Sequence, residues 1–148
     1  LSKLMRHLLY DSEREKIPIG KEIDFIRNYV DLMKMRYSEK ILIDLQISGQ
    51  FPDKSIPPLL FTSFVENAFK HGISYLNSSF IHITFFCTQE FLTFEIRNSI
   101  AHVKQDEDHM GIGLENARRR LDLIFGDKYS LNIEAGKDEH FVRLTIPL

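Results

Sequence analysis

The spacing of hydrophobic residues changes once along the chain, at about residue 40. Before that point apolar residues recur every three or four positions, which is typical of amphipathic helices. A proline and a glycine in residues 17–20 interrupt the pattern, so we expect two helices rather than one. The pattern leaves open whether they pack on another helix or are ordinary core helices. Their apolar positions are Leu1, Leu4, Met5, Leu8 and Leu9, then Ile23, Ile26, Tyr29, Val30 and Met33.

After residue 40 the apolar residues alternate with polar ones, first at positions 41, 43, 45 and 47, which predicts a strand. Pro57-Pro58 predicts the start of a helix that runs to His71 and ends at Gly72, because prolines favour helix starts and glycines favour helix ends. The remaining predicted elements are strands at 80–87 and 91–97, an irregular segment at 99–110, a helix at about 113–125, and strands at 130–135 and 141–147.

These elements predict helices over residues 1–38, followed by an α/β (α+β) two-layer sandwich over residues 39–148. The sheet is expected to be mixed and mostly antiparallel. A length of 148 residues with 43% hydrophobic residues suits one domain with an ordinary core. A net charge of −2 gives no basic excess, so we expect no direct binding to nucleic acid.

The chain has no signal peptide and no apolar run near 18 residues, so this part of the protein is not expected to span a membrane. It begins with Leu1 rather than Met, and we interpret it as part of a longer protein. The single cysteine, Cys87, lies in an apolar run, which predicts a buried thiol in a reducing compartment.

The predicted helix that ends at Gly72 has an unusual polar face. Asn67, Lys70 and His71 are three and four positions apart, so they lie one above another on that face. An amide oxygen can bind a hard cation such as Mg²⁺, and a lysine and a histidine can contact phosphate oxygens. A merely solvated helix face explains the same pattern. The polar half comprises Thr62, Ser63, Glu66, Asn67, Lys70 and His71.

Two glycines, Gly111 and Gly113, precede the last predicted helix. Glycine lets the backbone approach a ligand closely, and the amides of a helix N-terminus favour an anion such as phosphate. A lone Gly-x-Gly is more often a plain turn. The irregular segment 99–110 has a length typical of a functional lid or of a disordered loop. Asn98, at the end of a predicted strand, can bind the exocyclic amine of a purine, but an isolated asparagine is more often a turn former.

Taken in order, these segments resemble the catalytic domain of LytS-type sensor histidine kinases. That domain belongs to the GHKL superfamily, with the gyrase, Hsp90 and mismatch-repair ATPases. Residues 57–72 are similar to the N box, with its Pro-Pro start and its Val-Glu-Asn-Ala-x-Lys-His-Gly end. Residues 111–121 are similar to the glycine box and the helix that follows it. The stretch 1–37 resembles the end of the dimerisation region. Two boxes in this order are far more specific than either alone.

The resemblance implies a Bergerat-type ATP-binding fold and a protein histidine kinase, which transfers the γ-phosphoryl group of ATP to a histidine upstream of this chain. Asn67 is implied to bind the Mg²⁺ of Mg-ATP, and Asn98 stands where the family has the aspartate that recognises adenine. Glu66 is our candidate for activating the acceptor imidazole or for orienting metal-bound water. The residues assigned to ATP are Asn67, Lys70, His71, Asn98, Gly111, Ile112, Gly113 and Leu114.

The family also implies a homodimer that forms through the N-terminal helices, and a response regulator with a LytTR-type DNA-binding output. The chain would then be the cytoplasmic portion of a membrane-anchored bacterial sensor. The phosphoacceptor histidine of the family lies before the position of Leu1, so His7 is not expected to be phosphorylated.

Two departures from the family keep other functions open. Residues 98–100 read Asn-Ser-Ile in place of Asp-x-Gly, and residues 138–140 read Asp-Glu-His in place of the late Gly-Thr. The alternative is a degenerate interaction module that no longer binds nucleotide, although the retained Asn67 argues against it. An ATP hydrolase of the chaperone or topoisomerase kind is disfavoured, because Ser63 stands where those enzymes have the water-activating glutamate.

Overall fold

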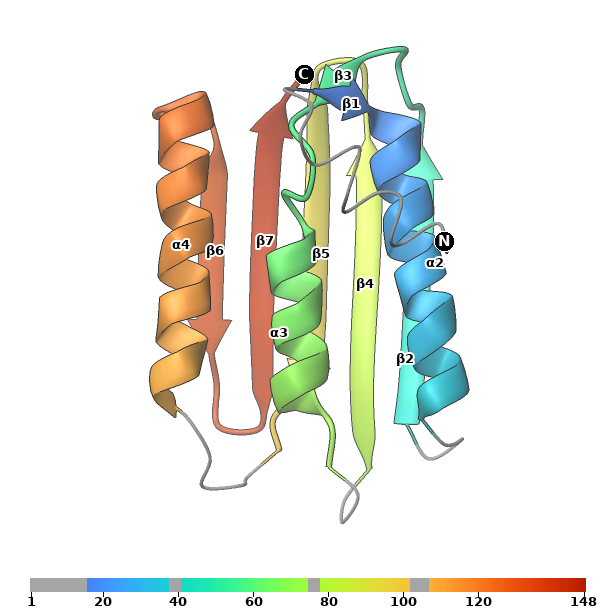
Figure 1. Ribbon diagram of the computed structural model, residues 1–148, viewed down its shortest axis with the longest axis vertical. Coiled ribbons are helices and arrows are strands. Elements are labelled where there is room, and N and C mark those ends of the chain that lie inside the picture. Colours follow the sequence, from blue (N-terminus) through green and yellow to red (C-terminus); the bar gives the residue numbers. More distant parts are fainter. Residues whose placement is uncertain (1–15, 38–40, 75–77, 102–106) are drawn as a thin grey trace.

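A computed structural model describes residues 16–37, 41–74, 78–101 and 107–148, the last range with backbone only for 107–112. Its centre is a five-stranded sheet in the order β2-β4-β5-β7-β6 (Figure 1). The first pair is parallel and the other three are antiparallel, so the predicted mixed, mostly antiparallel sheet is confirmed. The strands are β2 (Ile41–Gly49), β4 (Ser79–Cys87), β5 (Phe91–Ser99), β6 (Ser130–Ala135) and β7 (Glu139–Pro147).

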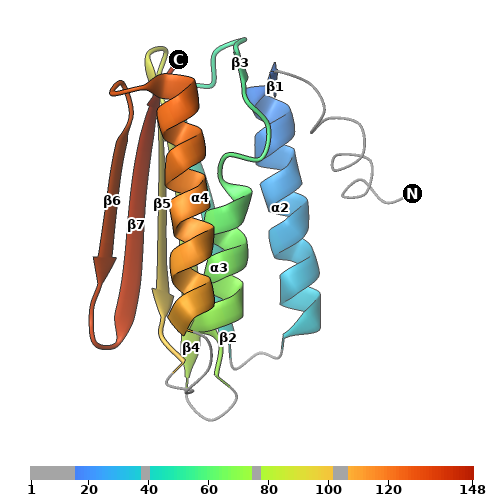
Figure 2. The same cartoon turned by 60° about the vertical axis from the view of Figure 1, so that its left-hand side comes forward.

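The described helices cover one face of this sheet, which confirms the two-layer sandwich (Figures 1 and 2). They are α2 (Ile19–Arg36), α3 (Thr62–Gly72) and α4 (Glu107–Phe125). Buried and more exposed residues alternate along β4, β5 and β7, as expected for a sheet with one covered face. A short antiparallel pair, β1 (Ile17–Pro18) with β3 (Ser55–Ile56), lies at one end. Among the described helices, none is long and apolar enough to cross a bilayer.

A cluster of phenylalanines joins the turn before α3 to the centre of the sheet. The ring centroid of Phe61 lies 5.2 Å from that of Phe85 and 5.1 Å from that of Phe94, and all three rings are buried. Such aromatic contacts stabilise a core beyond the area they bury. Cys87, 1% exposed, is buried as predicted, and burial raises the pKa of its thiol.

The helix α2 belongs to the same hydrophobic core as the sheet. Its Tyr29 ring packs edge-on against Phe69 of α3, with 5.7 Å between centroids. The structure therefore favours the ordinary core helix over a helix that packs only on another helix. The predicted helix over residues 1–9 lies outside the described residues, and the boundary between 1–38 and 39–148 remains a prediction. The buried residues of α2 are Ile19, Glu22, Ile23, Phe25, Ile26 and Val30.

The helix α3 begins at Thr62 and not at Pro57, so the predicted start was five residues too early. Residues 58–61 form a turn instead, because Leu59 has a φ of 61°, in the left-handed region that a right-handed helix does not use. The side chain of Thr62 is also buried rather than on the polar face, at 8% exposure.

The helix α4 begins at Glu107 and not at about Gly113. Residues 107–110, predicted as irregular, are helical, and Gly111 and Gly113 lie inside the helix rather than ahead of it. Two features explain the difference. Acidic residues such as Glu107 and Asp108 favour a helix start, and an internal glycine weakens a helix by only about 0.5–1 kcal/mol without ending it.

Candidate nucleotide-binding site

The C-terminal end of α3 is joined to the end of β5 by hydrogen bonds. The Ser99 hydroxyl donates to the Gly72 carbonyl oxygen at 2.7 Å and accepts from the Phe80 amide at 3.0 Å. The Ala101 amide donates to the His71 carbonyl oxygen at 3.0 Å. The last turn of the N-box helix and the strand end that carries Asn98 therefore form one rigid corner, at the lower edge of Figure 1.

Gly72 allows the close approach at this corner. A Cβ atom on Gly72 would lie 3.0 Å from the Asn98 side-chain nitrogen and 3.0 Å from the Ser99 carbonyl oxygen. The second atom belongs to the backbone of a central strand, which shifts only at a cost. Packing against the Asn98 segment therefore favours glycine at position 72, because any larger residue would have to displace these atoms slightly.

The predicted metal and phosphate residues lie on the outer side of α3. Asn67 and His71 are half-buried and Lys70 is exposed. Within the described residues, the Asn67 amide makes no hydrogen bond and the Lys70 ammonium makes no ion pair. An amide oxygen with no competing donor suits a hard cation, and an unpaired ammonium suits phosphate oxygens. The residues present therefore fit Mg²⁺ and a phosphate chain.

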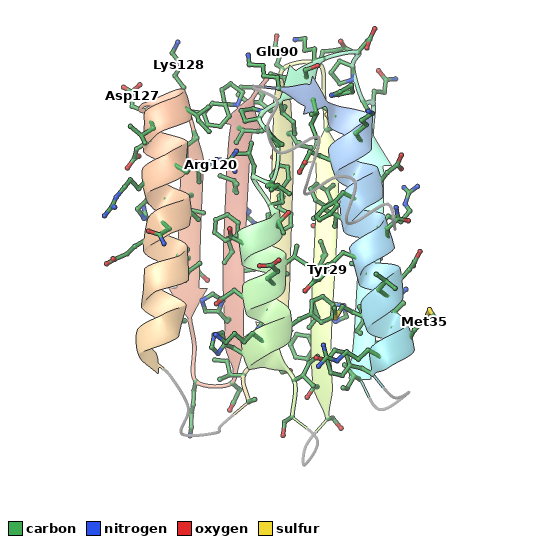
Figure 3. The ribbon with its side chains drawn as sticks, in the orientation of Figure 1. Tyr29, Met35, Glu90, Arg120, Asp127 and Lys128 are labelled. Carbon is green, nitrogen blue, oxygen red and sulfur yellow. The ribbon has the colours of Figure 1, made fainter. Side chains whose placement is uncertain are left out.

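Glu66 lies on the side of α3 that faces α2. Its charge is one of the causes, after burial, that raise the pKa of Tyr29 to about 12; Figure 3 labels Tyr29 between the two helices. Although Glu66 is exposed, partial burial raises the pKa of its carboxyl group. A raised pKa is the direction that suits a carboxylate acting as a general base. Its catalytic role remains a prediction.

Asn98 occupies the buried face of β5, at 2% exposure. Its amide nitrogen donates to the Ser99 carbonyl oxygen at 2.8 Å. Because the nitrogen is the atom that donates to Ser99, the amide oxygen of Asn98 is left to accept a hydrogen bond from an exocyclic amine. The orientation suits adenine, whereas the low exposure leaves a ligand little surface to contact.

His140 is a neighbour of the site that sequence reasoning missed as a site residue. It pairs with Asn98 in the register of β5 and β7 and is 4% exposed. Burial, and then the charge of His71, lower the pKa of His140. The signal was present in the sequence, because position 140 is in phase with the apolar residues 142, 144 and 146 of the same strand.

We expect the buried His140 to make the chain less stable in mild acid. Its folded pKa lies below the ordinary 6.5, so the unfolded chain binds the proton more readily. Stability is therefore lost as pH falls from above 6.5 toward the folded pKa, by no more than about 1.4 kcal/mol per pH unit.

Urea unfolding of the wild type and of His140→Gln between pH 8 and pH 5 measures this effect. The variant should show the shallower decline over that range. Equal slopes in the two proteins would contradict the assignment of this pH dependence to His140.

The glycine pair lies on α4, the helix beside α3 (Figures 1 and 2). A Cβ atom on Gly113 would meet nothing within 4 Å. Packing within the described residues therefore does not require glycine at that position. The part of Gly111, Ile112, Gly113 and Leu114 in nucleotide binding remains a prediction, and so does a lid over residues 99–110, of which 102–106 lie outside the described residues.

A cavity of about 750 Å³ lies at the opposite end of α3 and α4 from the joined corner. Its lining includes Pro57, Pro58, Arg120 and Lys128 but none of the residues predicted to bind ATP. This cavity is therefore not part of the candidate nucleotide site.

The fold is that of histidine kinase catalytic domains. The catalytic domain of histidine kinase ThkA superposes with a TM-score of 0.61 at 13% identity, over 89% of this chain and 93% of that one. The histidine kinase domain of the blue-light activated kinase EL346 from Erythrobacter litoralis superposes with a TM-score of 0.64 at 19% identity, over 91% and 69%. A family model described as histidine kinase matches residues 1–41.

Curated relatives narrow the resemblance to LytS-type sensor proteins, as the sequence predicted. Sensor protein LytS of Staphylococcus haemolyticus (strain JCSC1435) is 27% identical, over 99% of this chain and 27% of its own length. Sensor histidine kinase BtsS of Escherichia coli (strain K12) is 24% identical, over 90% and 24%. The chain thus spans about a quarter of these relatives. Its similarity to LytS-type sensors along nearly the whole chain, together with the kinase fold, confirms the resemblance.

Proposed function

We propose that this chain is the ATP-binding catalytic part of a two-component sensor histidine kinase. In that role it transfers the γ-phosphoryl group of ATP to a histidine upstream of residue 1. The observation that carries the proposal is the rigid corner at the end of α3. There the N-box turn with Asn67 and His71 is fixed through Gly72 to the strand end that bears Asn98.

Each residue has a chemical task in this proposal. The bound Mg-ATP would supply the phosphoryl group, and its Mg²⁺ would neutralise the charge that develops during transfer. Asn67 would hold the metal through its amide oxygen, and Lys70 would contact the phosphates. The amide oxygen of Asn98 would accept a hydrogen bond from the adenine amine. Glu66, with its raised carboxyl pKa, would act on the acceptor imidazole.

The proposal extends to partners and location. Because LytS and BtsS are named as sensors, we propose a homodimer that assembles through N-terminal helices in the region that the family model matches. We also propose a response regulator as partner, with a LytTR-type output. The chain would be the cytoplasmic portion of a membrane-anchored protein.

A second candidate function is a degenerate ATPase-fold interaction module that no longer binds nucleotide. One observation favours it, the 2% exposure of Asn98 together with the donation of its amide to Ser99. In this reading Asn98 closes the corner of the fold and recognises no base.

Calorimetric titration of ATP into this chain, with and without MgCl₂, separates the two functions. Binding that depends on Mg²⁺ is expected if the chain is a kinase catalytic part. The absence of heat at millimolar ATP under both conditions would reject the kinase proposal and favour the interaction module.

A further inference from the structure

A single peptide group before α3 is held from both sides by charged residues of the flanking helices. The Leu59 amide donates to a carboxylate oxygen of Glu22, on α2, at 3.0 Å. Arg120, on α4, donates from its guanidinium to the Pro58 carbonyl oxygen at 2.5 Å; Figure 3 labels it. The Pro58 carbonyl and the Leu59 amide belong to the same peptide bond. Each of the two polar groups of this peptide bond is thus held by one charged side chain, the amide by Glu22 and the carbonyl by Arg120.

The two contacts fix a backbone conformation that the chain does not favour. Leu59 has a φ of 61°, and a side chain with a Cβ atom is disfavoured in the left-handed region. Hydrogen bonds to charged groups are among the strongest in proteins and offset such strain. Glu22 is fully buried, at 0% exposure, and Arg120 is partly buried. Burial lowers the pKa of Arg120 and the charge of Glu22 raises it, so the two groups attract each other.

The held peptide sets where α3 starts and how it is rotated. Two residues after it, the Phe61 carbonyl accepts the amides of Phe64 and Val65 and starts the helix. Asn67 lies on the next turns of α3. Arg120 lies seven residues after Gly113 on α4, about 10 Å along a helix axis. The peptide therefore joins α2 to both helices that carry the predicted nucleotide residues.

We propose that Glu22 and Arg120 are positioning residues that couple α2 to the nucleotide site through the Pro58–Leu59 peptide. A displacement of α2 then turns α3 and α4 together, and bound nucleotide in turn stiffens α2. Residues 1–41 match the histidine kinase family model, so α2 lies where a signal from the N-terminal side would arrive. The effect on nucleotide binding rests on the proposed function, whereas the contact of Glu22 and Arg120 with the Pro58–Leu59 peptide does not.

The contact is tested without nucleotide, by amide hydrogen exchange of the free chain. Arg120→Met removes the donor on α4 while keeping its apolar stem. It should speed exchange in α2 by about tenfold and leave the central strands β4 and β5 as slow as in the wild type. Arg119→Met, at an exposed position of the same helix, is the matched control and should change neither. Unchanged exchange in α2, or equal acceleration in the strands, would overturn the coupling.

The effect of this coupling on nucleotide binding is tested by measuring Mg-ATP affinity in a double-mutant cycle of Glu22→Gln and Arg120→Met. Each single change should weaken affinity by about tenfold, and the double variant should be no weaker than either, because both residues hold one peptide. Arg120→Lys, which keeps one charged donor, should recover part of the loss. Asp24→Asn, at an exposed position of α2, is the control for Glu22 and should bind normally.

Two results separate failure of this inference from failure of the proposed function. If the wild type binds no Mg-ATP, the kinase proposal falls, while the exchange experiment still decides whether α2 and α4 are coupled. If the wild type binds but the two losses multiply in the double variant, Glu22 and Arg120 act separately and the coupling proposal is rejected.

Discussion

Replacing Asn67 with alanine is expected to abolish Mg²⁺-dependent nucleotide binding and leave the chain folded. Asn67 is half-buried on the outer side of α3, and its amide makes no hydrogen bond within the described residues. Its loss therefore removes no hydrogen bond within the described residues, and alanine is the better helix former. Loss of a group that merely supports a metal ligand costs 10–100-fold in affinity. Loss of the ligand itself should cost about 100-fold or more.

Titration calorimetry with ATP and MgCl₂ measures this effect, and thermal unfolding checks the fold. Ser63→Ala is the matched control, because Ser63 is exposed one turn earlier on the same helix. It should bind as the wild type does. Unchanged Mg-ATP affinity in the Asn67→Ala variant would reject Asn67 as a ligand of Mg²⁺.

Replacing Gly49 with alanine is expected to lower the free energy of unfolding by about 3 kcal/mol or more. Gly49 has a φ of 94°, which disfavours any residue with a Cβ atom. A Cβ atom there would lie 2.1 Å from the carbonyl oxygen of Cys87, a distance that no rotamer change can relieve. That oxygen also accepts the Gln50 amide at 2.9 Å, so the end of the β2–β4 pairing must open.

Urea denaturation measures this loss of stability, which should appear as a lower midpoint concentration of urea with an unchanged m-value. Gly20→Ala is the control, because Gly20 lies in α2 and a Cβ atom there would meet nothing within 4 Å. That change should be neutral or should stabilise the chain by about 0.5–1 kcal/mol. A Gly49→Ala protein within about 1 kcal/mol of the wild type would mean that the strand end adapts without cost.

The strands were predictable because their signal is local. Alternation in the sequence predicted a strand at 130–135, and β6 has these bounds. It also predicted strands that start at residues 80 and 141, within two residues of the observed starts of β4 and β7. Each strand buries every second residue against the helices, so the pattern and the structure share one cause.

The two predicted helix starts were wrong for different reasons, and only the cause at α3 is not local. Leu59 adopts its left-handed conformation with Glu22, 37 residues away, accepting its amide hydrogen bond. The local sequence Pro-Pro-Leu-Leu therefore does not predict a hydrogen bond to Glu22. At α4, the glycine pair predicts a start at about Gly113, yet the helix begins at Glu107, because acidic residues favour a helix start and an internal glycine does not end a helix.

The candidate site was only partly predictable. Asn67, Lys70 and His71 followed from helical spacing, and Asn98 from its place at a strand end. The roles of Ser99 and Gly72 were not predicted, because a hydroxyl and a carbonyl oxygen that lie 27 residues apart meet only in the folded chain. Whether these residues bind nucleotide remains a prediction that the calorimetric experiments decide.

By itself the sequence determined the class of fold, the approximate positions of most strands and the order of the two boxes. These depend on periodicity and spacing, which neighbouring residues encode. Only the tertiary structure decided which residues close the corner around Asn98, that α2 belongs to the core, and that Glu22 and Arg120 hold one peptide between them. Such contacts join segments 27 to 62 residues apart, and their geometry depends on how the described helices pack on the five-stranded sheet.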